Sequence, residues 1–456
     1  MPLRRIALVA GALLRALGRL PAGGLVRDAG VLASGNLATS ALEALALVLA
    51  ARSLGTEAFG ALALIHSYVF VVDTLVNFQS GQAVTRYGAR ALLRKQGGEF
   101  EVVIKVGTML DAGAALLAAV VALLGLGWAS QWLRWTPEIK QIARPYCVAI
   151  ALNMIGTPTA VLGLFRRFEA LAIQRTGWST AKVVGTMIAT GAGAGLRSFV
   201  LIWAAAYAAN GVAVLALGWR ELYRQGFHHV LRAPMRDLAR LHPGILSFVV
   251  KTNLSSSVRL GAQESDVLFV GGFLGDAAAG IYKVAKSFGS IPTRLGAPIQ
   301  DSIYPEMARL WAAGCAAEFR AYVFRFGLFA GLVGLAISLL FLLEGQQILT
   351  FLVGPDFGSA VAPLNIYMTA CVLYLFGVAL RPAMLSMERP GRILLIYVGA
   401  HLIYFPTLLA LLPRLGVLGA AIAQLVFHGV WFVAMSSSVA TLLGRSLETQ
   451  PARLDP

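Results

Sequence analysis

The sequence predicts an all-α polytopic membrane protein, and two observations carry this prediction: the composition and the length of the apolar segments. Of the 456 residues, 58% are hydrophobic and only 13% are charged, with a mean hydropathy of +0.73. A soluble domain averages about 25% charged residues. The apolar segments are long enough to cross a bilayer, which takes about 20 helical residues. We therefore expect a bundle of transmembrane helices.

Hydropathy divides the chain into twelve candidate spans in two groups of six. They cover residues 29–51, 58–82, 103–127, 142–164, 173–195, 198–218, 244–271, 277–303, 322–343, 359–380, 392–412 and 416–440. The expected parts are an amphipathic cytosolic segment (1–28), a first group of spans (29–218), a basic cytosolic linker (219–243), a second group (244–443) and a cytosolic tail (444–456). Arginines among the apolar residues of the first segment are typical of an interfacial helix.

Basic residues are unevenly distributed between the two sides of the predicted membrane. Most of the 38 Lys and Arg lie in the N-terminal segment, the loops after even-numbered spans and the C-terminal tail. The loops on the other side hold Arg52, Arg134, Lys140, Arg144, Arg197 and Arg414. Cytosolic loops carry the excess of basic residues, so both termini are expected in the cytosol. The net charge of +16 thus follows membrane topology, and we expect no nucleic-acid partner.

The seventh and eighth spans carry an unusual number of charges. A charge at membrane depth costs a few kcal/mol or more unless it is paired or hydrated, so such residues usually face a bundle interior or an aqueous cavity. At helical spacing, the charges of each span fall on one face. These residues are Lys251, Arg259 and Asp266 in the seventh span, and Lys283, Lys286, Arg294 and Asp301 in the eighth. The pattern predicts a water-filled cavity lined by basic side chains.

Structural explanations exist for some of these charges. Asp266 and Lys283 lie at similar depth on neighbouring helices, so they can simply neutralise each other. Lys251 can extend its ammonium group to the cytosolic interface. Arg259 has no acid one turn away on its face, which favours contact with a substrate.

The first six spans supply a weaker set of polar residues. Lys182 lies deep in the fifth span, Glu43 in the first, and His66 and Asp73 share one face of the second. Buried carboxylates and imidazoles can change protonation near neutral pH. Glu43, His66, Asp73 and Asp266 are therefore candidates either for coupling transport to protons or sodium ions, or for closing the cavity by ion pairs.

A short internal repeat relates the two groups of spans. Residues 54–60 read LGTEAFG and residues 274–280 read LGDAAAG, and at the same offset His66 matches Lys286 and Ser67 matches Ser287. Six spans per group would place the halves in parallel orientation, as in some transporters. A match this short can also arise by chance.

Four prolines lie within or at the ends of spans. Pro158, Pro292, Pro298 and Pro382 would each remove a backbone hydrogen bond and bend a helix, as a hinge or as a static kink. No metal-binding cluster, phosphate loop or nucleophile motif is present, and the three cysteines give no disulfide framework. We expect no cofactor beyond a coupling proton or sodium ion.

Several loose motifs resemble a known family. They are RSLGTEAFGALALIHSYVFVVDTLVNFQSGQAVTRYGA after the first span, DVLFVGGFLGDAAAGIYKVAKSF, IYPEMARL, ILTFLVGPDFGSAVAPLNIY and LPRLGVLGAAIAQL. Together these motifs resemble the Wzx-like oligosaccharide flippases of the MOP superfamily over nearly the whole chain. The resemblance implies two six-helix lobes around a central cavity that opens alternately to each side of the bacterial inner membrane.

The resemblance also implies a cargo and partners. The cargo would be a polyprenyl-diphosphate-linked oligosaccharide for O-antigen, capsule or exopolysaccharide synthesis, and polysaccharide polymerase or export machinery would act with it. Lys and Arg are natural partners for a diphosphate. A cation antiporter like the multidrug extruders of the same superfamily is the first alternative. A membrane polymerase or ligase is the second, although no long external loop is present to carry its catalytic residues.

Overall fold

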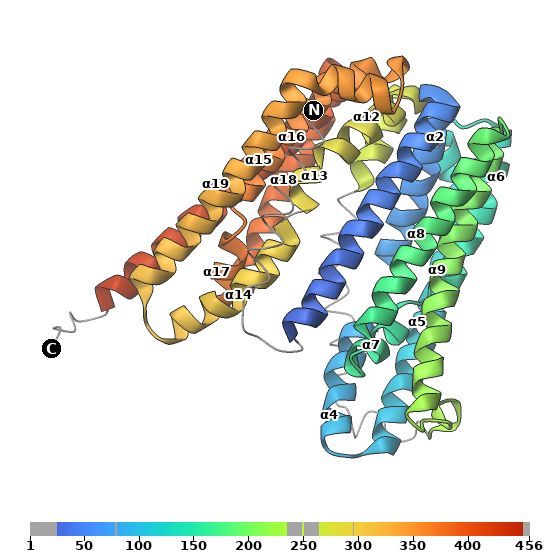
Figure 1. The fold of residues 1–456 in the computed structure, drawn as a ribbon. Coiled ribbons are helices and arrows are strands. Elements are labelled where there is room, and N and C mark those ends of the chain that lie inside the picture. Colours follow the sequence, from blue (N-terminus) through green and yellow to red (C-terminus); the bar gives the residue numbers. More distant parts are fainter. Residues whose placement is uncertain (1–24, 78–79, 235–248, 250–263, 295, 450–456) are drawn as a thin grey trace.

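The computed structural model describes residues 25–77, 80–234, 249, 264–294 and 296–449. These residues are helical almost throughout, and no strand occurs within these ranges. The predicted all-α class is confirmed. Figure 1 shows two groups of long helices that lie side by side.

The N-terminal bundle comprises the helices before residue 234. They are α2 (Leu25–Val76), α3 (Gly81–Ala83), the π-helical turn η1 (Val84–Gly88), α4 (Ala89–Leu93), α5 (Gly97–Trp132), α6 (Pro137–Ala149), the 3₁₀ turn η2 (Ile150–Leu152), α7 (Gly156–Leu164), α8 (Phe168–Gly191), α9 (Leu196–Arg224) and the 3₁₀ turn η3 (Val230–Arg232). Within this bundle α2 packs on α8, α5 and α9, and α9 also packs on α6 and α7.

The C-terminal bundle comprises the described helices after residue 263. They are a helix over residues 264–274, α12 (Asp276–Gly289), α13 (Ile291–Arg294), α14 (Gly296–Ala312), α15 (Ala316–Leu352), the 3₁₀ turn η4 (Pro355–Ala360), α16 (Val361–Phe376), α17 (Leu380–Ser386), α18 (Pro390–Leu415) and α19 (Val417–Thr449). Here α19 packs on α18 and α16, α15 on α16, and α14 on α17.

Seven described helices are long and apolar enough to cross a membrane, and the bent pair formed by α6 with α7 would make an eighth. The chain is therefore a multi-pass membrane protein, while the count of twelve spans stays a prediction. Part of the difference has a clear cause. At about 1.5 Å per residue α2 would extend about 78 Å, more than twice the roughly 30 Å of hydrocarbon. Its backbone breaks at Gly55 (φ 72°), so α2 contains two spans joined by a sharp turn.

Other predicted spans are interrupted in the membrane, and the interruptions occur at matching places in the two bundles. The second span breaks between α2 and α3, and the fourth between η2 and α7, with a bend of 40°. In the C-terminal bundle the eighth breaks around α13, and the tenth between α16 and α17. Discontinuous spans at corresponding positions are a feature of transporter binding sites.

The prolines account for the positions of these breaks differently from the prediction. Pro158, Pro292, Pro298 and Pro382 lie in the first turn of α7, α13, α14 and α17, respectively. The first N–H groups of a helix have no intrahelical partner, so proline costs little there. The predicted interruptions of the helices are therefore found next to these prolines, but each proline lies in the first turn of a new segment, so the predicted loss of a helical hydrogen bond does not occur.

A buried carboxylate joins the two breaks of the N-terminal bundle. Asp111 of α5, which is 2% exposed, accepts the Ser80 N–H at 2.8 Å and the Thr157 N–H at 2.6 Å. These amides begin α3 and α7, where the helix dipole favours negative charge. Asp111 therefore fixes two broken helices against each other.

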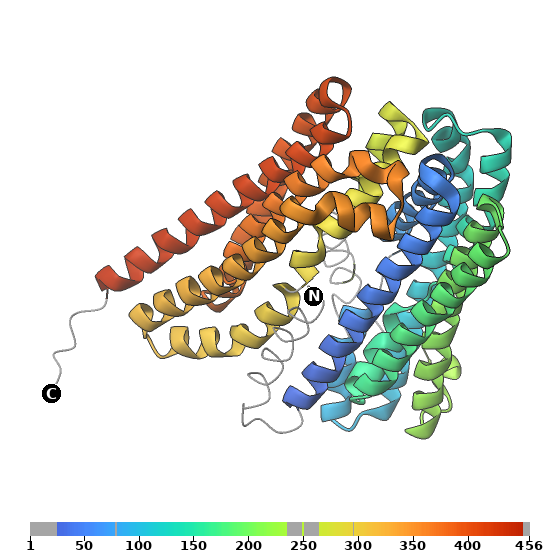
Figure 2. The same cartoon turned by 45° about the horizontal axis from the view of Figure 1, so that its top comes forward.

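The two bundles approach each other at one end, which we call the converging end. Figures 1 and 2 show the bundles meeting where α2 and α12 cross and separating towards α4 and α14. The contact there is very close. A Cβ atom on Gly60 would lie 1.8 Å from the Asp276 carbonyl oxygen, and one on Gly280 would lie 2.5 Å from the Thr56 oxygen. These glycines occupy the same position in the two copies of the internal repeat.

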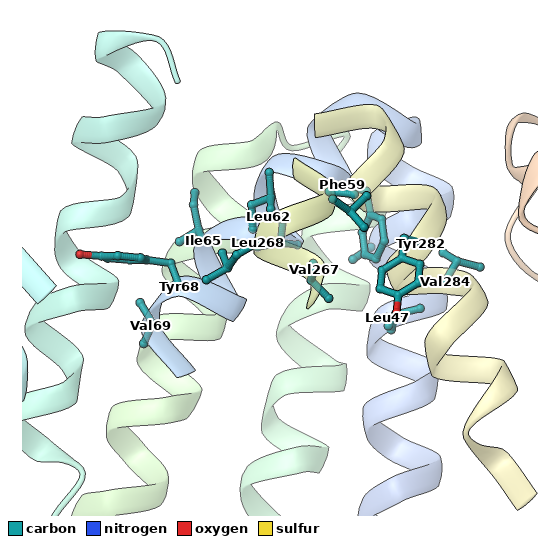
Figure 3. Packing of buried hydrophobic residues seen from close by; sticks show 14 of the residues in the cluster. Leu47, Phe59, Leu62, Ile65, Tyr68, Val69, Val267, Leu268, Tyr282 and Val284 are labelled. Atoms are coloured by element: carbon teal, nitrogen blue, oxygen red, sulfur yellow. The ribbon is translucent and has the colours of Figure 1, made fainter. Parts of the chain in front are cut away.

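The first glycines of the two copies also behave alike, since Gly55 and Gly275 have φ values of 72° and 88°. Below the glycine contact, apolar side chains from both bundles form one buried cluster (Figure 3). It includes Leu47, Phe59, Leu62, Ile65, Tyr68 and Val69 of α2 with Val267, Leu268, Tyr282 and Val284. The repeat thus brings equivalent segments into contact and seals the converging end.

Candidate functional site

A cavity of about 170 Å³ lies between the two bundles, next to the apolar cluster, with which it shares Leu47. Both bundles line it, through α2, α8 and α9 on one side and through residue 264, α12, Ser290 and α13 on the other. The lining residues are Glu43, Leu47, His66, Lys182, Trp203, Glu264, Lys283, Lys286, Ser287, Ser290 and Arg294. Four of the six basic residues predicted for the site are therefore brought together.

The remaining two basic residues, Lys251 and Arg259, lie outside the described residues. Their predicted contact with substrate stays a prediction.

The eighth-span lysines are paired with carboxylates, although in a different combination from the predicted one. Lys286 Nζ lies 2.8 Å from Asp266 Oδ1, and Lys283 Nζ lies 2.6 Å from Glu264 Oε2. The expected pair of Asp266 with Lys283 is wrong. Because Lys286 follows Lys283 by about one helical turn, the two lysines share a face but reach carboxylates at different depths on the neighbouring helix.

Asp266 is a fully buried anchor and not a group of the cavity surface. Its carboxylate is 0% exposed and accepts hydrogen bonds from Tyr282 at 2.7 Å, from Gln424 at 3.1 Å and from the Val267 N–H at 2.8 Å, in addition to Lys286. These donors come from three different parts of the C-terminal bundle and hold the carboxylate in a fixed position. Asp266 thus holds Lys286 in position behind the cavity wall.

Glu264 is the site residue that the sequence analysis did not select. Besides Lys283, its carboxylate lies 3.6 Å from Lys286 Nζ and accepts a hydrogen bond from Ser67 Oγ at 3.1 Å. Ser67 belongs to α2, so this bond crosses between the bundles. The sequence does contain a signal for Glu264: two acids, Glu264 and Asp266, precede the two lysines of the next span. The sequence analysis paired only Asp266 with a lysine.

The N-terminal bundle contributes a second ion pair. Lys182 of α8 lies 2.7 Å from Glu43 Oε2 of α2, and Ser179 donates to Glu43 Oε1 at 3.2 Å. The Lys182 ammonium also lies 3.8 Å from the centre of the Trp203 ring, a favourable cation–π geometry. Ser179 and Lys182 of the fifth span therefore contact the same carboxylate.

Arg294 and His66 complete the cavity lining. Arg294 donates from Nη1 to the Ser40 carbonyl of α2 at 3.0 Å, a second polar contact between the bundles. His66 Nδ1 lies 2.6 Å from the Tyr146 hydroxyl, and its ring meets Trp203 edge to face.

Asp73 lies away from the cavity lining, inside the N-terminal bundle. It accepts hydrogen bonds from Asn77 at 2.9 Å, from Asn153 at 2.8 Å and from the Tyr207 hydroxyl. Asn77 and Asn153 mark the breaks of the second and fourth spans, respectively. His66 and Asp73 share a helix face, as predicted. This face points into the N-terminal bundle, and of the two residues only His66 lines the cavity.

The lining therefore combines basic and acidic groups. Three lysines and an arginine surround two glutamates, with Asp266 behind them. Paired charges lower the cost of keeping ions at membrane depth. Among the described residues no group of His, Cys, Asp and Glu could hold a metal ion. The cavity thus presents four basic side chains, and each of its three lysines is paired with a carboxylate.

Comparisons with known proteins agree with this architecture. A family model described as polysaccharide biosynthesis protein matches residues 25–311. The inner membrane protein YghQ of Escherichia coli (strain K12) is 27% identical over 343 residues, which are 74% of this chain and 94% of that protein.

Two solved structures show the same fold. An inward-facing multidrug resistance MATE family transporter of the MOP superfamily superposes with a TM-score of 0.74 at 13% identity, over 92% of this chain and 100% of that chain. The lipid II flippase MurJ, in an inward closed conformation, gives a TM-score of 0.64 at 11% identity, over 90% of both chains. The family match covers more than half of the chain, and the resemblance noted in the sequence is confirmed. This chain therefore belongs to the polysaccharide biosynthesis protein family.

Proposed function

We propose that this protein is a flippase that moves a polyprenyl-diphosphate-linked oligosaccharide across the bacterial inner membrane by alternating access. One observation carries the proposal: Lys182, Lys283, Lys286 and Arg294 converge from both bundles on one cavity at membrane depth. The fold and family are those of transporters, and a diphosphate is the anionic part of this class of cargo. Lysine and arginine groups recognise phosphate oxygens through charge-assisted hydrogen bonds.

The proposed arrangement has twelve spans in two six-helix lobes, with both termini in the cytosol. The converging end then faces outwards, because it holds the loops that carry few basic residues. The cavity would receive cargo from the cytosolic side, where the bundles separate, with Lys251 and Arg259 as further basic contacts along the path. The polyprenyl tail would stay in the lipid between the lobes.

The cavity volume indicates which part of the cargo is held. About 170 Å³ is below the roughly 300–1,000 Å³ of ordinary small-molecule pockets. This space suits the diphosphate part of the cargo. The cavity therefore serves as the anchor point for the linker, and the sugars need the wider space towards the separated end. Release on the outer side would deliver the repeat unit to the polymerase or export machinery.

Coupling to an ion is proposed for the carboxylates and the histidine. Glu43 and His66 line the cavity, so they can exchange protons or a sodium ion with water that enters it. Asp73 and Asp266 are buried at contacts within each bundle, where a change of charge would alter the packing of the broken helices or of Lys286.

The test uses purified protein in liposomes that contain a fluorescent polyprenyl-diphosphate oligosaccharide. We expect the protein to make this lipid accessible from the opposite leaflet. We expect the variant Lys283→Gln, in which Lys286 still pairs with Asp266 and lies near Glu264, to insert normally but flip poorly. In cells, deletion of the gene should leave unpolymerised repeat units on the cytosolic leaflet. Absence of flipping by the folded wild-type protein would contradict the proposal.

The alternative is a cation antiporter, which the MATE-like fold and the two lining glutamates favour. Each glutamate is paired with a lysine, so an organic cation would have to displace an internal ammonium group. Transport of an organic cation against a proton or sodium gradient, with no movement of the diphosphate lipid, would establish this alternative.

A further inference from the structure

The Glu264 carboxylate lies where an anionic ligand would have to bind. Three donors converge on it: Lys283 Nζ at 2.6 Å, Lys286 Nζ at 3.6 Å and Ser67 Oγ at 3.1 Å. The Glu264 side chain is 21% exposed and lines the cavity, so an incoming ligand can reach it. A carboxylate and a phosphate accept hydrogen bonds from the same cationic donors in similar geometry. Both cannot hold these donors at once.

Asp266 differs from Glu264 in its burial and in its hydrogen-bond partners, the two properties that decide whether a ligand can displace a carboxylate. It is completely buried and accepts from Tyr282, Gln424 and a backbone N–H as well as from Lys286. Removing Lys286 from Asp266 would leave several donors still in place, so Asp266 has no reason to move. Of the three groups that contact the Glu264 carboxylate, Lys283 and Lys286 line the cavity, whereas Ser67 is buried beside it.

Resting on the proposed function, we infer that Glu264 is a resident counter-ion that the diphosphate linker displaces from Lys283 and Lys286, and that its return helps to release the cargo. The bond to Ser67 gives this exchange a mechanical consequence. Ser67 lies on α2 and Glu264 on the other bundle, so displacement of Glu264 breaks a hydrogen bond between the bundles. Cargo binding would thus remove one contact that holds the present conformation.

The exchange predicts opposite effects on binding and on transport. The neutral variant Glu264→Gln keeps the size of the side chain and frees the lysines from a competing anion. Because the diphosphate no longer has to displace a charged hydrogen-bond acceptor from the lysines, we expect it to bind about tenfold more tightly. Release then becomes slower, so flipping should fall at saturating lipid. A residue with a purely structural role would not tighten binding.

The experiment measures the binding of farnesyl diphosphate, and of farnesyl monophosphate for comparison, to the purified full-length protein in nanodiscs. Three variants are compared with wild type: Glu264→Gln, Glu264→Asp, which keeps the charge, and Glu306→Gln. The last removes a glutamate that pairs with Arg309 at 2.6 Å outside the cavity. A melting curve for each protein confirms folding before binding is measured.

Tighter diphosphate binding by Glu264→Gln with slower flipping, and near wild-type affinity for Glu264→Asp and Glu306→Gln, supports the inference. If Glu264→Gln does not fold, Glu264→Asp decides the matter: its retained carboxylate should leave wild-type affinity, and a large loss of binding would overturn the inference. Equal or weaker binding by folded Glu264→Gln, with normal binding by wild type, overturns the inference alone. Failure of wild type and all variants to bind either lipid contradicts the proposed function as well.

Discussion

Replacement of Gly60 by alanine should weaken the contact at the converging end. The added Cβ would lie 1.8 Å from the Asp276 carbonyl oxygen and 2.4 Å from its carbon, whereas even close carbon–oxygen contacts need about 3.3 Å. The obstacle is backbone at the start of α12, so no side chain can rotate away. The helices must therefore separate by roughly 1.5 Å, the difference between these distances.

The size of the effect follows from the cost of overpacking. Inserting a methyl group into a well-packed contact typically costs about 1–3 kcal/mol. If the cost falls on the conformation in which α2 and α12 touch, the balance between this conformation and the one in which they separate shifts by about 5- to 150-fold. Gly280→Ala should act in the same direction, since its Cβ would lie 2.5 Å from the Thr56 oxygen.

The assay is a distance distribution between spin labels on the two bundles at the converging end. Glu138 and Asp356 are exposed labelling positions near this end. We expect Gly60→Ala to increase the population with long distances. Gly177→Ala is the matched control, because Gly177 is also in a helix but its Cβ would meet nothing within 4 Å. If Gly60→Ala and Gly177→Ala give the same distribution as wild type, the glycine contact does not control the conformation.

Three further predictions concern single carboxylates and one lysine. Asp111→Ala leaves two buried backbone N–H groups without their acceptor, so we expect a loss of about 2–6 kcal/mol in stability, seen as a lower melting temperature. Burial, and then the nearby Glu57 carboxylate, raise the pKa of Asp276 from 3.8 to about 6 in the turn before the eighth span. The converging end therefore binds this proton more tightly than an exposed carboxyl does. Acid favours the contact, which loses stability as the pH rises from 3.8 to about 6, measurable with the same spin labels. Lys182→Gln leaves Glu43 without its cation, so both the melting temperature and the flipping rate should fall.

Each of these predictions has an internal control. Asp111→Asn retains one acceptor oxygen and should lose less stability than Asp111→Ala; equal melting temperatures would contradict the role given to the carboxylate. Asp276→Asn should remove the pH dependence between 3.8 and 6, and an unchanged profile would show that another group titrates. The double variant Lys182→Gln, Glu43→Gln should recover part of the melting temperature, which a packing role of Lys182 alone would not allow.

The sequence alone was sufficient for the class of fold and for the neighbourhood of the site. A segment that crosses a bilayer must be a helix or a strand of a closed barrel. The apolar segments of this chain have the length of helices, about 20 residues, so hydropathy determines the all-α class. Charges that cannot face lipid must face inwards, so Lys182, Lys283, Lys286 and Arg294 could be assigned to a shared interior from their depth and helical face. The internal repeat marked the two segments that meet at the converging end.

Only the tertiary structure decided which charges pair and which reach the cavity. Helical periodicity gives the direction of a side chain but not its partner on another helix, so Asp266 was assigned to Lys283 when it binds Lys286, and Glu264 was overlooked. The same limit applies to Asp73, whose face was correct but whose partners are Asn77, Asn153 and Tyr207 inside one bundle. The relative rotation and depth of packed helices depend on contacts between residues far apart in the chain, such as Gly60 with Gly280, and these contacts exist only once the helices have packed.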